Sequence, residues 1–278
     1  MNGRIPLALP GRYTAIGQAA YPPGESYLPK IEICEGRYLL RFARNRHDLD
    51  AVLKLRFEVF NLELGEGLAS SFQTGRDQDE FDLACHHLVV VETTEDKIVG
   101  TYRVQTGEMA SSGFGFYSAG EFNLSLLPRD VLDRSVELGR ACIAREHRNT
   151  IVLFLLWKGI AAYMLHNRKQ YLFGCCSLTS QDAREGLSVM RLIEQEGHMH
   201  KSLKVAPEAG FECEVDDWST AEIDTANIPK LFRTYLRFGA KVCGPPAIDR
   251  SFKTIDFLVI FDVAEMDGTS RRVFFGEP

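Results

Sequence analysis

Apolar residues recur along the chain in short runs that predict the strands of a sheet. In a half-buried strand successive side chains face opposite sides, so apolar and polar residues alternate. Tyr38–Ala43 shows this alternation and predicts the first strand. His86–Thr94 and Ile98–Thr106 are rich in β-branched residues and are joined by a short polar turn, which predicts a hairpin. Further strands are predicted at Ser135–Ala144, Tyr171–Leu178 and Ile255–Val263.

Between these runs apolar residues repeat with the period of a helix. His47–Glu63 carries such a stripe after Asn45 and Asp48, two residues that can cap a helix. Thr150–Asn167 is the most apolar segment and follows Asn149, another cap. It is shorter than the about 20 apolar residues of a membrane span and contains Lys158, so we interpret it as a buried helix. Two later helices are predicted, one opened by the capping box Thr179–Asp182 and ending near Glu196, the other running from Asn227-Ile-Pro229 to Gly239.

The order of these elements predicts an α/β fold. A hairpin precedes two units in which a helix joins strands, and this order favours a mixed sheet. Residues 1–36 are rich in Pro, Gly and Tyr and predict a partly irregular N-terminal arm. Residues 37–265 form the predicted domain, and the polar residues 266–278 a C-terminal tail.

Composition narrows the classes of function. The net charge of −6 argues against general binding to nucleic acid, so any anion site must be a local basic patch. Seven cysteines, an odd number with no CxxC spacing, are typical of reduced thiols in a cytosolic protein. We therefore expect no metal site, and we interpret His86 and His87 as core or surface histidines.

Charged residues interrupt several of the apolar patterns. Arg56 lies on the apolar stripe of its predicted helix, and Arg103 lies in a predicted strand. Glu137 and Arg140 interrupt the strand Ser135–Ala144, where a bulge near Gly139 would bring them toward one side. A buried charge is costly unless it is paired. These residues therefore indicate either a polar cleft or a buried ion pair with a structural role only.

Two loops carry further candidates. Asp79 and Asp82 precede the His86 strand, in a loop that is either solvated or part of the cleft. Arg145, Arg148 and Asn149 lie between a strand and a helix N-terminus, where backbone N–H groups and the helix dipole suit a phosphate group.

Four short motifs resemble those of acyl-homoserine-lactone synthases. Arg56-Phe-Glu-Val-Phe60 is similar to their Arg-x-x-Val-Phe, and Asp79-Glu-Phe-Asp82 to their Asp-x-Tyr/Phe-Asp. Gly100-Thr-Tyr-Arg103 matches Gly-x-x-Arg, and Glu137-Leu-Gly-Arg140 resembles Glu-x-Ser-Arg. The motifs occur in the same order, but a glycine stands before Arg140 where those synthases prefer a hydroxyl residue.

A closer resemblance is to the ornithine–acyl carrier protein N-acyltransferases of the GNAT superfamily. It covers residues 37–265 and is carried by the stretches Glu137–Cys142, Leu156–Tyr163, Cys243–Asp249 and Thr254–Leu258. The resemblance implies a GNAT fold, in which helices flank a central mixed twisted sheet. The fourth and fifth strands, here Ser135–Ala144 and Tyr171–Leu178, splay apart around the acyl thioester.

The resemblance also implies an activity. A long-chain acyl group, with or without a 3-hydroxyl, passes from acyl carrier protein to the α-amine of ornithine or a similar amino acid. The glycine-rich loop of coenzyme A acetyltransferases is absent, which favours a carrier-bound phosphopantetheine thioester as the donor substrate. No bound cofactor, metal or nucleic acid is expected. The expected location is the cytoplasm, with peripheral contact at the inner membrane face for product release.

Each candidate residue receives a role within this reading. The catalytic candidates are Glu137, as the general base, with Arg140, Asp79 and Asp82. The substrate-binding candidates are Arg56, Phe60 and Arg103, and those for the phosphopantetheine arm are Arg145, Arg148 and Asn149. Two alternatives stay open, namely a signal synthase like the acyl-homoserine-lactone synthases and a non-catalytic hemolysin-like protein that binds membranes.

Overall fold

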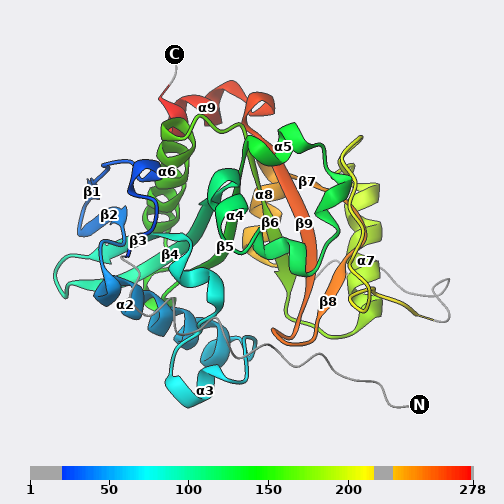
Figure 1. Cartoon of the computed structure of the whole chain (residues 1–278), viewed down its shortest axis with the longest axis horizontal. Coiled ribbons are helices and arrows are strands. Elements are labelled where there is room, and N and C mark those ends of the chain that lie inside the picture. Colours follow the sequence, from blue (N-terminus) through cyan, green and yellow to red (C-terminus); the bar gives the residue numbers. More distant parts are fainter. Residues whose placement is uncertain (1–20, 216–227, 277–278) are drawn as a thin grey trace.

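A mixed β-sheet forms the centre of the molecule (Figure 1). The computed structural model describes residues 21–215 and 228–276. Within them nine strands lie in the order β1-β2-β3-β4-β5-β6-β9-β7, with β8 paired to β9. β5 and β6 run parallel, and the other pairings of the described strands are antiparallel. The strands are β1 Ile33–Glu35, β2 Tyr38–Phe42, β3 His86–Glu92, β4 Lys97–Thr106, β5 Ser135–Ile143, β6 Tyr171–Leu178, β7 Lys241–Val242, β8 Ala247–Asp249 and β9 Thr254–Asp262.

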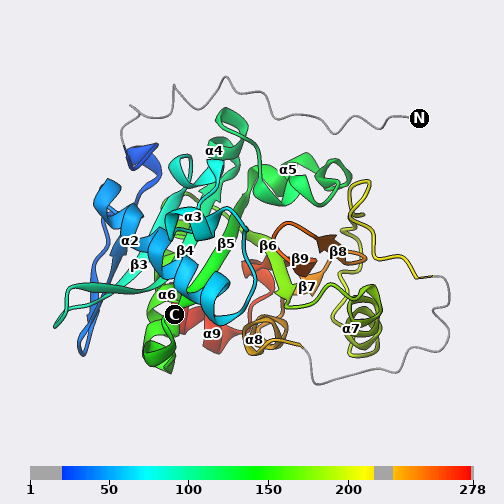
Figure 2. The same ribbon diagram turned by 90° about the horizontal axis from the view of Figure 1, so that it is seen from below.

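Helices cover both faces of this sheet (Figure 2). α6 packs closely on one face, because Gly159 leaves room for the side chain of Leu88. α6, α8 and α9 lie together in this view, whereas α4 and α5 lie on the opposite side. The α-helices are α2 Arg46–Arg56, α3 Ser71–Thr74, α4 Gly107–Ser112, α5 Arg129–Asp133, α6 Thr150–His166, α7 Ala183–Gln195, α8 Lys230–Arg237 and α9 Gly268–Phe275. A π-helix, Phe57–Glu63, extends α2.

The strands and the main helices confirm the elements predicted from the sequence, and four details differ. α7 begins at Ala183, because Asp182 is its cap while the hydroxyl of Thr179 bonds Glu66 instead. The helix after Asn45 ends as a π-helix. β1 lies within the expected irregular arm, where a strand of three mostly exposed residues gives no readable pattern. α9 lies within the expected polar tail. Residues 1–20, 277–278 and Asn227 lie outside the described residues.

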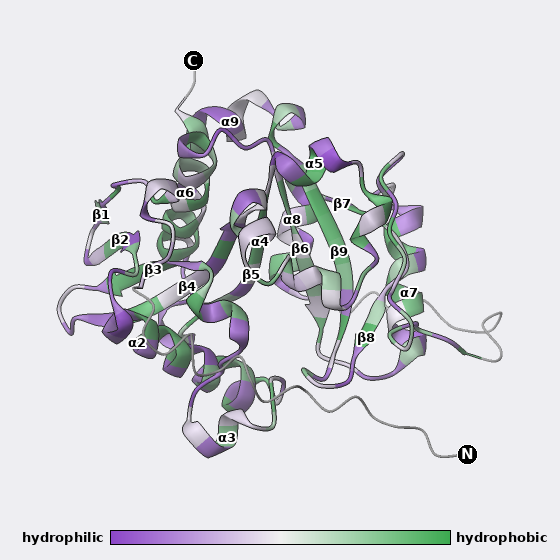
Figure 3. Ribbon diagram, in the orientation of Figure 1, coloured by the Kyte–Doolittle hydropathy of each residue, from purple (hydrophilic) through white to green (hydrophobic). Residues whose placement is uncertain are grey.

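Most apolar residues of α6 and β9, which Figure 3 colours green, are buried, although Ile151 and Leu165 of α6 are exposed. Leu155, Leu156 and Met164 of α6 are among the side chains with almost no exposure, which confirms the prediction of a buried helix. Among the described residues, no helix has the length and apolarity that a membrane crossing requires.

β5 and β6 separate shortly after they begin. They pair only from Ser135–Glu137 to Tyr171–Phe173. Beyond this point β5 continues beside β4, and β6 beside β9. A Cβ atom at Gly174 would lie 2.1 Å from the carbonyl oxygen of Leu138, so the two chains touch where they part. The splay expected between the strands of Ser135–Ala144 and Tyr171–Leu178 is confirmed, and we call it the fork.

Candidate active site

Arginine and aspartate side chains form a buried ion-pair network beside the fork. Arg56, at the end of α2, donates to Asp77 at 2.7 Å and to Asp82 at 2.6 Å. Arg103 of β4 donates to Asp79 at 2.5 Å and to Asp82 at 2.9 Å. Burial alone would raise the pKa of Asp82, but Arg56 and Arg103 outweigh it and hold that pKa below its usual range. The network therefore keeps its charges paired.

The aspartates of this network also hold their own loop. The Asp79 carboxylate accepts from the backbone N–H of Phe81, and the Asp82 carboxylate accepts from the N–H of Asp79. This capping box opens the 3₁₀ helix Glu80–Leu83. The structure thus brings Arg56, Arg103 and these two predicted catalytic aspartates together as expected, but as a scaffold whose carboxylates are already paired with arginines. Only Asp77 Oδ1 and Arg103 Nη2 among the atoms of these pairs are buried without a hydrogen-bond partner in the described structure.

Arg140 connects the network to the fork. Its Nη2 donates to Asp79 at 3.1 Å, and its Nε lies 3.4 Å from Asp77. Its guanidinium stacks over the rings of Tyr117 and Phe252, at 4.7 Å and 4.2 Å from their centroids. Arg140 also has φ 48°, a left-handed conformation that is uncommon outside glycine, where the register of β4 and β5 shifts. The bulge expected near Gly139 is present, and strained backbone of this kind is typical of functional sites.

The carboxylate of Glu137 accepts several hydrogen bonds, unlike a carboxylate that is free to act as a general base. Its carboxylate accepts from the Gln105 amide at 2.6 Å, from the backbone N–H groups of Tyr117 and Ser118, and from the Ser118 hydroxyl at 2.7 Å. Glu137 is buried, and Arg140 does not contact it. The geometry favours a role in fixing the Tyr117 loop over a role in proton transfer, and the predicted catalytic role stays a prediction.

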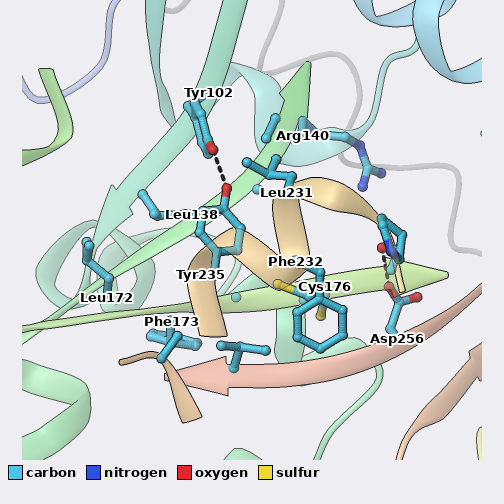
Figure 4. A pocket seen from close by; sticks show the side chains of 18 of the residues that line it. Tyr102, Leu138, Arg140, Leu172, Phe173, Cys176, Leu231, Phe232, Tyr235 and Asp256 are labelled. Atoms are coloured by element: carbon cyan, nitrogen blue, oxygen red, sulfur yellow. Dashed lines mark hydrogen bonds between the residues drawn. The ribbon is translucent and has the colours of Figure 1, made fainter. Parts of the chain in front are cut away.

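A cavity of about 400 Å³ crosses the fork. On one face of the sheet it is lined by apolar side chains of three helices, among them Trp157 of α6, Tyr235 of α8 and Phe275 of α9. On the other face it reaches Tyr117 and Glu121. Figure 4 shows this lining, with the hydroxyls of Tyr102 and Tyr235 bonded to each other in its apolar part. Of the residues predicted for the site, Phe60 and Arg140 line the cavity.

Carboxylates from separate elements meet at the other end of this cavity. Glu121 follows a 3₁₀ turn, Asp249 ends β8 and Asp256 lies in β9, and all three line the cavity. They are 4%, 7% and 3% exposed, and one oxygen of each lies within 4.8 Å of the others. We call these three residues the carboxylate trio. Such a spacing of oxygen atoms suits a cation or an ammonium group.

The electrostatics of the trio are opposite to those of the network. The described structure gives none of its members an ion pair with lysine or arginine. Burial raises the pKa of Asp256 to about 6, although the hydroxyls of Ser177 and Thr254, which donate to it at 2.5 and 2.7 Å, act in the opposite direction. Burial, followed by the charges of Asp256 and Asp249, raises the pKa of Glu121 well above its ordinary value. The trio is thus short of positive charge.

Sequence reasoning missed the trio, although one signal for it was present. Asp256 interrupts the apolar strand Ile255–Val263 in the way that Arg103 interrupts its own strand. Asp249 and Asp256 also lie inside two stretches that carry the family resemblance. Glu121 gave no signal, because it lies in a segment that predicted only loop and short helix.

The residues expected to hold the phosphopantetheine arm lie outside the cavity lining. Arg148 pairs with Glu63 at 2.6 Å, and Arg145 is exposed. Asn149 caps α6 by accepting from the N–H of Val152, as predicted. These positions surround the N-terminus of α6, and their role toward the donor stays a prediction.

The remaining sequence candidates have structural roles. His86 and His87 are buried, and burial lowers the pKa of each to about 4. One ring bonds Tyr163 and the other the carbonyl of Asp82, as expected of core histidines. All seven cysteines are free thiols.

The fold and the fork place the chain in a known class. The family described as acetyltransferase (GNAT) domain matches residues 55–158, which run from α2 into α6. Among solved structures, FeeM, an N-acyl amino acid synthase from uncultured soil microbes, superposes with a TM-score of 0.50 over 83% of this chain and 94% of that one, at 12% identity. The protein is an acyltransferase with the GNAT fold.

Relatives of known activity give the particular family. An L-ornithine N(alpha)-acyltransferase of Agrobacterium fabrum is 31% identical over 248 residues, which are 85% of each chain. An enzyme of the same name from Rhizobium meliloti is 30% identical over 270 residues, 91% of this chain and 88% of the other. The chain belongs to the family of the L-ornithine N(alpha)-acyltransferases.

Proposed function

We propose that this enzyme transfers a long-chain acyl group from a carrier thioester to the α-amine of ornithine. One observation carries the proposal, namely that a single cavity crosses the fork and is apolar on one face of the sheet and acidic on the other. An acyl chain suits the apolar part. Ornithine, which carries two ammonium groups, suits the carboxylate trio. The name shared by the relatives supports the same acceptor.

Within this proposal the donor is acyl carrier protein, and the acyl chain is long enough to fill the apolar part, with or without a 3-hydroxyl. The thioester carbonyl lies at the fork, beyond the contact of Leu138 with Gly174, where the two strands part. The product is a lyso-aminolipid, so its release involves peripheral contact with a membrane from the cytoplasmic side.

The carboxylates divide the work on the acceptor. Asp249 and Asp256 hold the side-chain ammonium of ornithine, because both residues line the cavity and their carboxylate oxygens lie close together. Arg140 lies opposite them and attracts the α-carboxylate. Glu121 receives the proton of the α-ammonium, since its raised pKa suits a base that works near neutral pH. Its carboxylate has one contact with a neighbouring side chain, the thiol of Cys175 at 3.7 Å.

The transfer itself needs no covalent enzyme intermediate. The α-ammonium loses one proton to Glu121, and the free amine attacks the thioester carbonyl carbon. The C–N bond forms and the C–S bond breaks. The nitrogen loses its second proton to the leaving sulfur, so the carrier departs as a thiol. Backbone N–H groups of the bulge at Arg140 lie on the strand that borders the fork and are the candidates for stabilising the oxyanion.

The proposal is tested with the purified full-length chain. Ornithine and 2-aminopentanoate, which has the same carbon chain without the terminal amine, are offered with one acyl carrier thioester, and products are identified by mass spectrometry. We expect kcat/KM for ornithine to exceed that for 2-aminopentanoate by about 10²-fold or more, because the analogue leaves buried carboxylates unpaired. A parallel series with acyl-coenzyme A tests the donor.

Each outcome has one meaning. No N-acyl product with any acceptor would rule out the proposed reaction. Equal rates with both acceptors would remove the role of the trio while leaving the acyltransfer in place. Equal efficiency with coenzyme A and carrier thioesters would remove the preference for the carrier protein. A fall in rate with a chelator would assign the trio to a metal ion.

A further inference from the structure

Aromatic side chains from three helices close the apolar end of the cavity. Trp157 lies on α6, Phe238 follows α8, and Phe274 and Phe275 lie on α9, and all four line the cavity. Trp157 meets Phe238 and Phe274 with ring centroids 4.9 and 5.5 Å apart, in the edge-to-face arrangement that aromatic pairs favour. These rings therefore line the cavity at this side.

α9 differs from the other helices of this wall in the way it is held. None of its residues is buried. A helix this short is not stable in isolation, and beyond its cap at Asp267 it depends on packing against neighbours. Phe274 supplies part of that packing through its contacts with Trp157 and Phe154, the latter with centroids 5.5 Å apart, and Phe275 packs against the main core. The position of α9 is thus tied to the cavity it covers.

α9 also lies at the far end of the cavity from the carboxylate trio. Asp256 and Phe261 of β9 both line the cavity, and five residues at about 3.3 Å each separate them by about 16 Å. α9 follows the Phe261 end of this strand, which Figure 1 shows beneath it. In Figure 4, Leu172, the strand partner of Phe261, and Asp256 lie on opposite sides of the view. A chain that starts near the trio therefore ends against α9.

We propose that α9 is the end wall of the acyl site and that Phe275 sets the length of the acyl chain that is transferred. This inference rests on the proposed function, in which the apolar part of the cavity binds the acyl chain. The ring of Phe274 is engaged by its aromatic neighbours. Phe275 also lines the cavity, and none of the aromatic ring contacts found in the described residues involves it. Its ring is the surface that an additional methylene group meets first.

The experiment compares variants in both directions with a control on the same helix. Phe275→Ala enlarges the cavity, Phe275→Trp shortens it, and Val273→Ala changes a side chain of α9 that is 44% exposed. Transfer to ornithine is measured for saturated carrier thioesters of increasing length. One methylene changes kcat/KM in an apolar pocket by about tenfold or more. We therefore expect Phe275→Ala to raise, by about tenfold, the ratio of kcat/KM for the next longer donor to that for the wild-type optimum.

Phe275→Trp and Val273→Ala have different expected results. Phe275→Trp moves the optimum to shorter donors, and Val273→Ala leaves the length profile as it is. The KM for ornithine stays constant in all three, because Asp256 of the trio lies about 16 Å along β9 from the Phe261 end that α9 follows. An unchanged length profile in both Phe275 variants, with or without a uniform loss of kcat, would overturn the inference and leave α9 a structural element.

A binding measurement separates this inference from the proposed function. Dissociation constants of free fatty acids of increasing length are measured by calorimetry for the wild type and the Phe275 variants, without any acceptor. If no acyl group is transferred to ornithine but the preferred fatty acid still shifts with residue 275, the role of Phe275 is supported and the proposed reaction is excluded. If transfer to ornithine occurs but the length dependence of neither transfer nor binding shifts, the proposed reaction is supported and the role of Phe275 is excluded.

Discussion

Two groups of buried charge lie within the same domain, and they differ in whether the charge is balanced. In the ion-pair network Arg56 and Arg103 each contact two aspartates, and Asp79 and Asp82 also accept backbone hydrogen bonds. In the carboxylate trio the oxygen atoms face one another across a cavity, with hydroxyls, backbone N–H groups and a thiol as partners. A balanced group is complete without a ligand, whereas an unbalanced one gains from a cation. The difference indicates that the network is a scaffold and the trio a binding site.

Breaking the network has the largest expected effect. Arg56→Met keeps the length of the side chain but removes one of the two arginines beside each of Asp77 and Asp82, which leaves one buried negative charge uncompensated. We expect the free energy of unfolding to fall by about 3–5 kcal/mol, since removing one partner of a buried ion pair strands a charge. Chemical denaturation measures the loss. A variant as stable as the wild type would contradict a scaffold role.

In the trio, replacing a charged residue by a neutral one is expected to reduce activity without reducing stability. Asp256→Asn removes a negative charge that burial disfavours, so at neutral pH we expect stability to be unchanged or higher by the order of 1–3 kcal/mol. In contrast, kcat/KM for ornithine is expected to fall by about 10²-fold, because the side-chain ammonium loses a charged partner.

The sign of the stability change follows from linkage. The folded-state pKa of Asp256, about 6, lies above its ordinary value of 3.8, so wild-type stability falls as pH rises between these values and stays lower above them. Asp96→Asn is the matched control, since Asp96 is exposed and its left-handed backbone suits asparagine. Melting temperatures and kinetics of both variants are compared. A destabilised Asp256→Asn with normal kinetics would make Asp256 a structural residue.

A substitution of Glu137 tests whether this buried carboxylate resembles the ion-pair network or the carboxylate trio. Its four hydrogen bonds to Gln105, Tyr117 and Ser118 make it a complete group, like the members of the network. Glu137→Gln turns an amide toward these donors, so we expect a loss of stability of about 1–3 kcal/mol. The loss of kcat should be smaller than that of Asp256→Asn. A strong loss of kcat with unchanged stability would support instead the base role predicted from the sequence.

Much of the fold and only part of the site could be predicted from the sequence. Alternation and helical period located β2 to β6, β9 and α6, because these elements bury one face or both. The same patterns gave no sign of β1 or α9, whose residues remain partly exposed and whose positions depend on packing. Arg56, Arg103 and Asp82 were recognised as unusual charges in apolar or motif positions, and they do meet.

A charged residue within an apolar pattern does not show whether its charge is paired with an opposite charge in the fold. Whether Arg103 has two charged partners, or Asp256 has none among the described residues, depends on which strands and loops the fold brings together. The trio joins residues separated by more than a hundred positions, from Glu121 to Asp249. No local pattern contains that information.

The pH dependence of acceptor choice gives a smaller effect that sharpens the comparison. As pH falls through about 6, Asp256 becomes neutral and no longer attracts the side-chain ammonium. Loss of free α-amine slows both acceptors alike, so the measured quantity is the ratio of kcat/KM for ornithine to that for 2-aminopentanoate. We expect this ratio to fall by about tenfold between the plateaus above and below this pKa, which corresponds to about 1.4 kcal/mol. A ratio independent of pH would exclude Asp256 from ammonium binding.

An exposed ion pair completes the comparison and has the smallest expected effect. Arg148 pairs with Glu63 on the surface, and their side chains are 40% and 24% exposed. Such pairs contribute little, so Arg148→Ala should change the free energy of unfolding by less than about 1 kcal/mol. Its expected influence is on the donor, because Arg145 and Arg148 are basic residues predicted to bind the phosphopantetheine arm of the carrier.

We expect Arg145→Ala to raise the KM for the carrier thioester more than Arg148→Ala does, because Glu63 already compensates the charge of Arg148. The difference should shrink as ionic strength rises, since exposed charges are screened over about 10 Å at 0.1 M salt. Neither substitution should alter the KM for ornithine. Steady-state kinetics at low and high salt measure all three quantities. Equal effects of the two substitutions would show that the pairing seen with Glu63 does not persist when the carrier binds, and effects that are independent of salt would remove both arginines from the docking surface.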